Sequence, residues 1–305
     1  MISRRDIIDL AQSCGFTAVG CAPAEPVAAW RKEQWQHYLT SGRQAQMHYL
    51  EQNLEKRLNP QLLVEGAKSV VCVALNYFTE AQFPADGYTI ARYARGKDYH
   101  DVVKALLHKM LHSIAEITGV DNPGRAFCDT APVDEHYWAW RTGLGWLGKN
   151  TQLIIPHAGS YFFIGTLILT EDIDAYDTPQ PNRCGTCTRC IDACPTRALS
   201  PNSGLDARRC LSYLTIEHRG DLPDFAAQAL SPCFYGCDRC QDACPHNRFA
   251  HPTTCEPFQP SPELLRQTPD DWQRMDEAVY RHLFKGSAVK RAKYEGLKRN
   301  IACLQ

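Results

Sequence analysis

Two closely spaced cysteine motifs in the second half of the chain restrict its fold more than any other feature of the sequence. The first motif runs Cys184-x2-Cys187-x2-Cys190-x3-Cys194-Pro195, and the second runs Cys237-x2-Cys240-x3-Cys244-Pro245. Gaps of two residues allow one tight loop to present several thiolates to a single centre. Ten of the 15 cysteines lie between Cys184 and Cys255, whereas the other five are scattered, as expected of small buried apolar residues.

This spacing predicts two [4Fe–4S] clusters arranged as in bacterial two-cluster ferredoxins. In that arrangement the cysteine before the proline ligates the cluster of the other motif. Cluster one would therefore take Cys184, Cys187, Cys190 and Cys244. Cluster two would take Cys194, Cys237, Cys240 and one ligand from outside the motifs. Spacing alone leaves Cys210 and Cys233 as equal candidates for that ligand, with Cys255 as a weaker third.

Zinc is the main alternative for paired Cys-x2-Cys elements, and it would make the chain a zinc-binding RNA-interaction protein. A zinc site needs neither the four-cysteine spacing of the first motif nor the proline that follows each motif. The repeated motif therefore favours iron–sulfur clusters, which conduct electrons in single steps. An electron carrier without a catalytic site is the alternative from a different functional class.

The rest of the chain of 305 residues predicts an α+β protein in three parts. In residues 1–172, apolar periodicity favours helices at the N-terminus, over 26–56 and over 99–117, and strands over 69–78, 152–155 and 161–169. Residues 173–250 contain an Asp- and Pro-rich linker and the cysteine module. Residues 251–305 are predicted to be a helical, basic segment.

Charge gives no global argument for a nucleic-acid partner, because the net charge is −1. Residues 281–300, however, contain seven Lys and Arg residues against the single acidic Glu295. Such a patch favours phosphate contacts, although a solvated helix face would have the same composition. The candidate RNA-binding residues are Lys290, Arg291, Lys293, Lys298 and Arg299.

The sequence also favours a cytoplasmic location. It contains no uninterrupted apolar run of about 18 residues, so no membrane-spanning helix is expected. The N-terminal segment lacks the continuous apolar core of a signal peptide. We therefore expect reduced cysteines, not disulfides.

Two carboxylates, Asp129 and Glu135, lie in an otherwise apolar segment before the clusters. A desolvated carboxyl group there could donate a proton, and a helix cap is an equally good interpretation of either residue. The Gly-rich segment Gly143-Leu-Gly-Trp-Leu-Gly-Lys149 could cradle a phosphate, but it is not a Walker A motif and could equally be a turn.

Together these elements resemble the epoxyqueuosine reductase family over nearly the whole chain. The matching segments are Arg57 with Asn59-Pro60, Arg92-Tyr93 through Asp98-Tyr99-His100, Asp129-Thr-Ala-Pro with Glu135, Gly143 to Lys149, Gly159-Ser160, both cysteine motifs, Asp206 to Glu217, Tyr235 to Pro245, Asn247-Arg248, Gly286 to Arg291 and Leu297 to Ile301. Their joint occurrence is far more specific than any single motif.

The resemblance implies an N-terminal cobalamin-binding α/β domain of nitroreductase-like fold and a ferredoxin-like two-cluster module. Electrons would pass through both clusters to base-off cobalamin, which reduces epoxyqueuosine to queuosine at the wobble position of tRNA. An electron donor protein would be the second partner, and a monomer is expected.

The resemblance also assigns roles to residues. The proton donor maps onto Asp129, and the fourth ligand of cluster two maps onto Cys210. Arg57 and Ser212 map onto positions near the corrinoid. Further cofactor contacts are predicted for Lys97, Tyr99, His100, Asp129 and Lys149.

Three features depart from the family pattern. Asp134 stands beside Glu135, where it could be mistaken for the acid, and Cys233 is an extra thiol. The chain ends at Gln305 without the longer helical-repeat tail of many relatives, which shortens the expected tRNA surface. A reductive dehalogenase is the rival enzyme; Arg4-Arg5 resembles its twin-arginine signal, but no apolar export segment follows.

Overall fold

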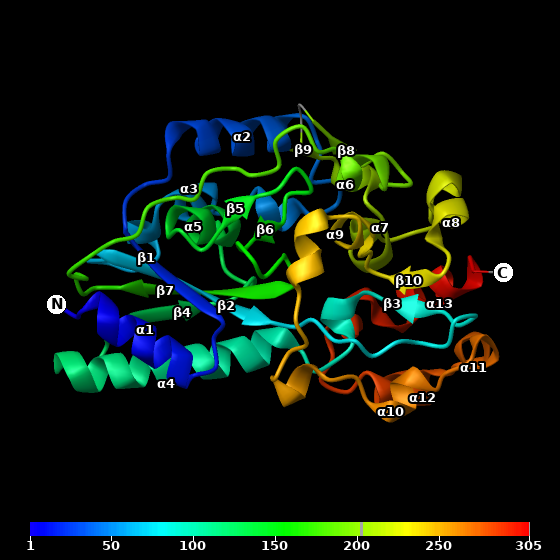
Figure 1. The fold of residues 1–305 in the computed structure, drawn as a ribbon. Coiled ribbons are helices and arrows are strands. Elements are labelled where there is room, and N and C mark those ends of the chain that lie inside the picture. The colour runs from blue at the N-terminus through cyan, green and yellow to red at the C-terminus, as the bar shows by residue number, and fades with distance from the viewer. Residues whose placement is uncertain (202–203, 305) are drawn as a thin grey trace.

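A four-stranded antiparallel sheet, covered by helices on both faces, forms the N-terminal half of the computed structural model, which describes residues 1–201 and 204–304 (Figure 1). In spatial order its strands are β1 (Ala18–Pro23), β2 (Ser69–Asn76), β7 (Phe162–Leu169) and β4 (Gly124–Phe127). Each neighbouring strand pair is antiparallel. An antiparallel sheet packed against helices makes this an α+β fold, so the predicted fold class is confirmed.

Strand β2 is buried on both faces, which explains its uninterrupted apolar sequence. Alternate side chains point to opposite faces of a strand. Val71, Val73 and Leu75 join the core beneath α1 (Arg4–Ser13) and α4 (Tyr99–Thr118). Val70, Cys72 and Ala74 join the opposite core, which packs against α5 (Glu135–Arg141). The predicted strand over 69–78 is confirmed.

Helix α4 begins and ends where its sequence directs. The Asp98 side chain caps its N-terminus by accepting the His100 N–H, and Gly119 ends it in the left-handed conformation. Its apolar stripe places Val103, Leu107, Met110 and Ile114 in the core. The predicted helix over 99–117 is confirmed.

The predicted continuous helix over 26–56 is wrong. The structure has α2 (Ala29–Thr40), a 3-10 turn at His48–Leu50 and α3 (Leu54–Leu58) instead. Gly42, Ala45 and Asn53 all have positive φ angles, which interrupt a right-handed helix. The predicted strand over 152–155 shortens to β6 (Leu153–Ile154), which pairs with β5 (Trp146–Leu147), and the strand over 161–169 is confirmed as β7.

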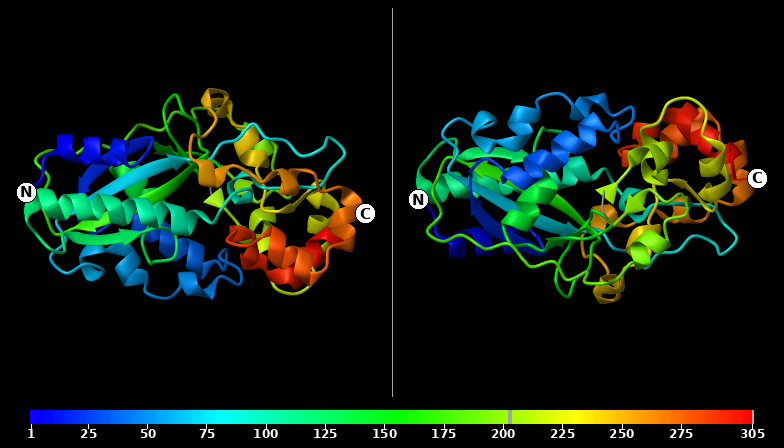
Figure 2. Two further views of the ribbon diagram at one scale, coloured as in Figure 1. Left: turned by 90° about the horizontal axis from the view of Figure 1, so that it is seen from below. Right: turned by 90° about the horizontal axis from the view of Figure 1, so that it is seen from above.

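A second apolar core lies at the other end of the molecule (Figure 2). It contains Ile90, Phe234 and Leu297, so it draws on all three predicted parts of the chain. The boundaries after residues 172 and 250 stay predictions. The remaining elements are β3 (Thr89–Ile90), α6 (Arg189–Asp192), β8 (Leu199–Ser200), β9 (Gly204–Leu205), α7 (Leu211–Ile216), α8 (Asp224–Leu230), β10 (Cys233–Tyr235), α9 (Arg239–Asp242), α10 (Pro262–Leu265), α11 (Pro269–Arg274), α12 (Glu277–Leu283) and α13 (Lys293–Ala302).

The packing of α4 on the sheet gives a test of the first core. Leu107 is fully buried, whereas Ile117 on the same helix is 50% exposed. Leu107→Ala is expected to lower the free energy of unfolding by about 2–5 kcal/mol, because the substitution leaves a cavity. Ile117→Ala is expected to change it by less than about 0.5 kcal/mol. Anaerobic urea denaturation of both variants measures the difference, and equal effects would contradict this packing.

Candidate active site and cluster cysteines

The structure gathers the cysteines of the two motifs into two groups of four. Cys184, Cys187, Cys190 and Cys244 line one cavity of about 140 Å³. The first three belong to the first motif, and Cys244 is the last cysteine of the second motif. The fold therefore brings together the crossed set that the spacing predicts for cluster one.

The second group lines one side of a larger cleft and consists of Cys194, Cys210, Cys237 and Cys240. Cys210 stands at the N-terminal end of α7. Cys233 lies on β10, where its thiol donates to the Tyr235 carbonyl at 3.3 Å, and Cys255 packs at the edge of the first core. The arrangement favours Cys210, whereas the spacing had left it level with Cys233.

The two groups suit something larger than a single ion. Among the residues that the structure describes, no three His, Cys, Asp or Glu side chains are arranged to hold one metal ion. A cubane holds its thiolates further apart than one zinc ion does, and the cavities leave that space.

Lys149 lies against the loop of the first motif. Its Nζ donates to the carbonyl oxygens of Gly185 at 2.8 Å and Cys187 at 3.0 Å. It lines the smaller cavity and lies outside the lining of the cleft. The lysine therefore supports the cluster loop through these two hydrogen bonds, and its predicted corrinoid contact stays a prediction. Lys149 ends the Gly-rich segment that begins at Gly143, so this segment supports the cluster loop. The structure adds no support for the interpretation of the segment as a phosphate cradle.

The larger cleft lies between the sheet and the cysteine module. Its volume is about 290 Å³, against about 140 Å³ for the smaller cavity, and it is open to solvent. Its lining combines Tyr93, Tyr99 and Phe163 with the polar residues Asp129 and Ser212. The Tyr99 ring stacks on Phe163 with their centroids 4.4 Å apart, which fixes this wall. Ser212 lies in this lining, and its contact with the corrinoid stays a prediction.

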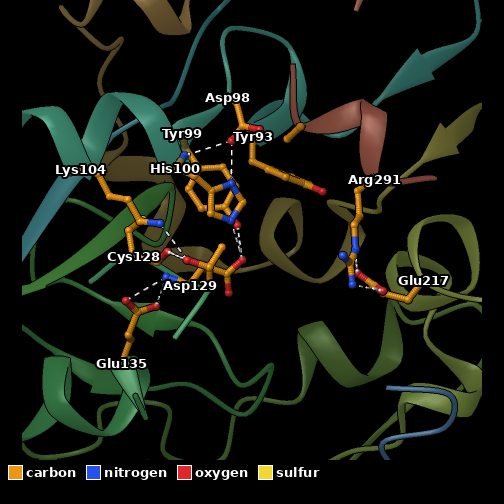
Figure 3. A network of polar contacts seen from close by, with 12 residues as sticks. Tyr93, Asp98, Tyr99, His100, Lys104, Cys128, Asp129, Glu135, Glu217 and Arg291 are labelled. Carbon is orange, nitrogen blue, oxygen red and sulfur yellow. Dashed lines mark hydrogen bonds and ion pairs between the residues drawn. The ribbon is translucent and has the colours of Figure 1, made fainter. Parts of the chain in front are cut away.

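Asp129 faces this cleft from a strained loop after β4. Its φ angle is +59°, a conformation that a non-glycine residue adopts only when its surroundings hold it there. The Asp129 carboxylate accepts a hydrogen bond from the Tyr99 hydroxyl at 2.5 Å and lies 3.0 Å from His100 Nε2. On the other side of the ring, His100 Nδ1 lies 2.6 Å from Asp98 (Figure 3). The resemblance contained Asp98, but its role as the partner of His100 was missed.

The two carboxylates determine the charge of His100. Burial would lower its pKa, but the hydrogen bonds to Asp129 and Asp98 raise it to about 9. Burial would likewise raise the pKa of Asp129, but the hydrogen bonds from His100 and Tyr99 hold it below its usual value. Near neutral pH, His100 is therefore protonated and Asp129 ionised.

Glu135 holds the Asp129 loop from behind. Both of its carboxylate oxygens accept the Asp129 backbone N–H, at 3.0 and 2.9 Å. Burial and the charge of Asp129 raise the pKa of Glu135 to about 8. The sequence left a proton donor and a helix cap as alternatives for Glu135. In the structure, Glu135 instead positions the Asp129 backbone.

Asp134 has a structural role. It caps the N-terminus of α5, accepts two hydrogen bonds from Arg31, at 2.6 and 2.8 Å, and accepts the Trp35 indole N–H at 2.7 Å. It is 3% exposed and points away from the cleft lining.

Arg57 is buried outside the cleft lining, with its guanidinium 5.0 Å from the centroid of the Trp35 ring. Its Nε has no hydrogen-bond partner among the described residues. Burial lowers the pKa of Arg57, and the charges of Asp134, Glu135 and Asp129 oppose that effect. Lys97 is exposed and lies outside the cleft lining.

Several basic side chains of the C-terminal segment are used in contacts within the molecule. Arg299 donates to the carbonyl oxygens of Gly220, His218 and Leu214, and Lys298 donates to that of Gln273. These two residues hold the fold together. Lys290 and Lys293 are exposed, and Arg291 pairs with Glu217.

Two groups of four cysteines, one of which lines a large cleft, are typical of an iron–sulfur oxidoreductase. A family model described as 4Fe-4S double cluster binding domain matches residues 183–247, and one described as Epoxyqueuosine reductase QueG, DUF1730, matches residues 57–130. The chain belongs to the epoxyqueuosine reductase family.

Curated relatives carry the same name. The chain is 44% identical to the epoxyqueuosine reductase of Cellulophaga algicola, over 96% of this chain and 93% of the relative. It is also 44% identical to that of Leadbetterella byssophila, over 98% of this chain and 97% of the relative. This family membership supports the reductase interpretation over the dehalogenase and carrier alternatives.

Solved structures agree. The structure of epoxyqueuosine reductase from Streptococcus thermophilus is 27% identical, with a TM-score of 0.88 over 98% of this chain and 80% of that chain. A crystal structure of epoxyqueuosine reductase with a tRNA-Tyr epoxyqueuosine-modified tRNA stem loop is 28% identical, with a TM-score of 0.87 over the same shares.

No helix among residues 1–201 and 204–304 is long and apolar enough to cross a membrane.

The choice of the fourth ligand of cluster two can be tested by iron analysis. Cys210→Ser is expected to remove about four irons per chain after anaerobic reconstitution, because it deletes a ligand of one cubane. Cys233→Ser is the matched control and is expected to keep the full iron content. Loss of iron from Cys233→Ser alone would overturn the assignment.

Proposed function

We propose that this chain reduces epoxyqueuosine to queuosine at the wobble position of tRNA, with cobalamin in the cleft, a [4Fe–4S] cluster on each cysteine group and Asp129 as the proton donor. One observation carries the proposal: Asp129 faces the same cleft that the second cysteine group lines. A reducing cofactor in that cleft would therefore have a cluster on one side and an acid on the other.

The residues present suit such a cofactor. The cleft is large, aromatic on one wall and polar on another, and Ser212 lies in its lining. The unpaired Nε of buried Arg57 costs free energy that an oxygen atom of a bound cofactor would recover. Ser212, Tyr99 and Arg57 are our proposed cofactor contacts, with His100 acting through Asp129. When bound, cobalamin would supply a low-potential cobalt centre as reductant, replenished from the clusters.

Conversion of the epoxide to an alkene consumes an electron pair and two protons and releases water. Negative charge builds on the epoxide oxygen as its bonds to carbon break, so an acid must lie close to it. Asp129 and His100 share a proton that resides on the imidazole in the resting site. His100 Nε2 passes its proton to the Asp129 carboxylate, and Asp129 delivers it to the epoxide oxygen. The second proton comes from solvent, to which the cleft is open, and the oxygen leaves as water.

The neighbours of Asp129 make this transfer geometrically defined. Tyr99 fixes one carboxylate oxygen, and Glu135 fixes the backbone. Asp98 holds the imidazole ring with Nε2 toward Asp129. The acid is therefore preorganised before substrate arrives.

The remaining parts of the proposal concern partners. A solved relative was crystallised with a modified tRNA stem loop, and Lys290 and Lys293 offer exposed charge for a phosphate backbone here. Arg291 joins them in part, whereas Lys298 and Arg299 contribute less because their donors are used internally. A separate electron donor protein, a monomeric enzyme and action in the cytoplasm, where tRNA is modified, complete the proposal.

The acid role of Asp129 predicts a specific loss. Asp129→Asn keeps the side-chain shape but cannot deliver a proton, so turnover of an epoxyqueuosine stem loop is expected to fall about 10²- to 10⁴-fold. Anaerobic single-turnover assays with a chemical reductant measure the rate. Cobalamin binding, seen in the visible spectrum, should persist. Full activity of this variant would remove Asp129 from the mechanism.

The shared proton predicts a pH limit. Because the pKa of His100 is raised to about 9, the proton is held below that pH and lost above it. The turnover rate of the wild-type protein is therefore expected to decline as pH rises through about 9. In His100→Gln this decline should shift to lower pH or disappear, with a lower rate throughout. Identical pH profiles for the two proteins would contradict the relay.

A further inference from the structure

Tyr49 is an exposed aromatic side chain that the reaction does not use. It lies in the 3-10 turn His48–Leu50 between α2 and α3, and 47% of it is exposed. A single exposed apolar side chain is common on a protein surface, so the contacts around Tyr49 decide what its ring can do.

The loop that carries Tyr49 is fastened to the cysteine module. The Gln46 backbone N–H donates to the Tyr213 hydroxyl at 3.0 Å, and the Gln46 side-chain oxygen accepts the Arg219 backbone N–H at 2.8 Å. The Ala207 N–H donates to the Arg43 carbonyl at 3.0 Å. The ring is therefore presented by a loop whose position is set by both halves of the molecule.

Arg291 backs the ring with a fixed positive charge. Its guanidinium lies 5.8 Å from the centroid of Tyr49, within the range of a cation–π contact. Its Nε and Nη2 donate to the two carboxylate oxygens of Glu217, at 2.7 and 2.8 Å. This bidentate pair fixes the plane of the guanidinium, and the exposed Lys290 and Lys293 flank it in sequence.

The Arg291–Glu217 pair that backs Tyr49 lies outside the cleft lining but within electrostatic reach of Asp129. Figure 3 shows the Arg291–Glu217 pair on one side and Asp129, with its partners, on the other, from separate elements. Burial and Glu217 raise the pKa of Tyr49 to about 12, Arg291 opposes this shift, and Asp129 adds to it. The same Asp129 charge also raises the pKa of Arg291. Both residues therefore lie within electrostatic reach of the proton donor.

We propose that Tyr49 is a stacking platform for an RNA base next to the nucleotide being reduced, with Arg291, Lys290 and Lys293 facing the adjoining phosphates. A nucleotide that enters an enclosed cleft must leave the stack of its loop, and its neighbour then loses a stacking partner. An exposed ring beside the opening replaces that partner, as aromatic side chains do for single-stranded RNA. This inference rests on the proposed function, because it requires RNA as substrate.

The platform can be tested by removing each stacking partner in turn. The experiment uses reconstituted holoenzyme without reductant and a fluorescent stem loop that carries epoxyqueuosine. Binding is followed by anisotropy. Tyr49→Ala is expected to weaken binding about 5- to 150-fold, whereas Tyr49→Phe, which keeps the ring, should stay close to the wild-type affinity. A loss in Tyr49→Phe equal to that in Tyr49→Ala would overturn stacking.

Phe225→Ala is the matched control. Phe225 on α8 is also an exposed aromatic residue, 36% exposed, beneath the guanidinium of Arg209 at 4.9 Å, but it lies outside the cleft lining. Tyr49 also lies outside that lining, but it contacts Arg291 and is within electrostatic reach of Asp129, whereas Phe225 contacts Arg209. Removal of Phe225 should therefore leave RNA affinity unchanged. An equal loss in Phe225→Ala and Tyr49→Ala would reject a specific platform.

A double cycle identifies the partner base. Two further stem loops each lack one base beside the wobble nucleotide, and one of them should bind the wild-type protein as weakly as intact RNA binds Tyr49→Ala. Combining that RNA with Tyr49→Ala should add no further loss. Additive losses for both RNAs would overturn the proposal. Wild-type holoenzyme that binds the intact RNA but never reduces it would instead refute the proposed function.

Discussion

The last cysteine of each motif lies with the cysteines of the other motif, and this exchange ties two short loops into one unit. Cys244 joins the first group, and Cys194 joins the second. Polar contacts bind this unit to the N-terminal half of the molecule. Lys149 donates to carbonyl groups of the first loop. Gln241 on α9 donates to the Ser160 carbonyl, and the Tyr161 hydroxyl donates to Asp242. Because these contacts fix the module against the sheet, they also fix the width and lining of the cleft.

Three carboxyl groups within seven residues differ in pKa and in role because their contacts differ. Asp134 is bound by Arg31 and Trp35 and is withdrawn from the cleft. Glu135 is buried beside another negative charge, so its pKa rises to about 8. Asp129 and Glu135 both line the cleft, but Asp129 is held by hydrogen bonds with Tyr99 and His100, which keep its pKa low. Their partners separate the structural, positioning and acidic roles.

Local pattern predicted the elements that bury a regular face. Strand β2 and helix α4 follow their apolar periodicity almost residue by residue, because both lie in the first core along their whole lengths. The prediction of a helix over 26–56 was wrong for the opposite reason. None of the residues of α2 is buried, and positive φ angles at Ala45 and Asn53 interrupt the helix. Those breaks place Tyr49 against Arg291, a position that no periodicity indicates.

Cluster chemistry follows from the amino-acid sequence alone, because the number, type and spacing of nearby thiolates are local properties of two short motifs. Family resemblance added Asp129 and Cys210 from matched residues. Tertiary structure decided which thiols share a cavity, which of the basic residues remain exposed and which acid faces the cleft. These outcomes depend on contacts between segments far apart in the chain: His100 at the start of α4 meets Asp129 after β4, and Arg291 meets Glu217 after α7, only in the folded molecule.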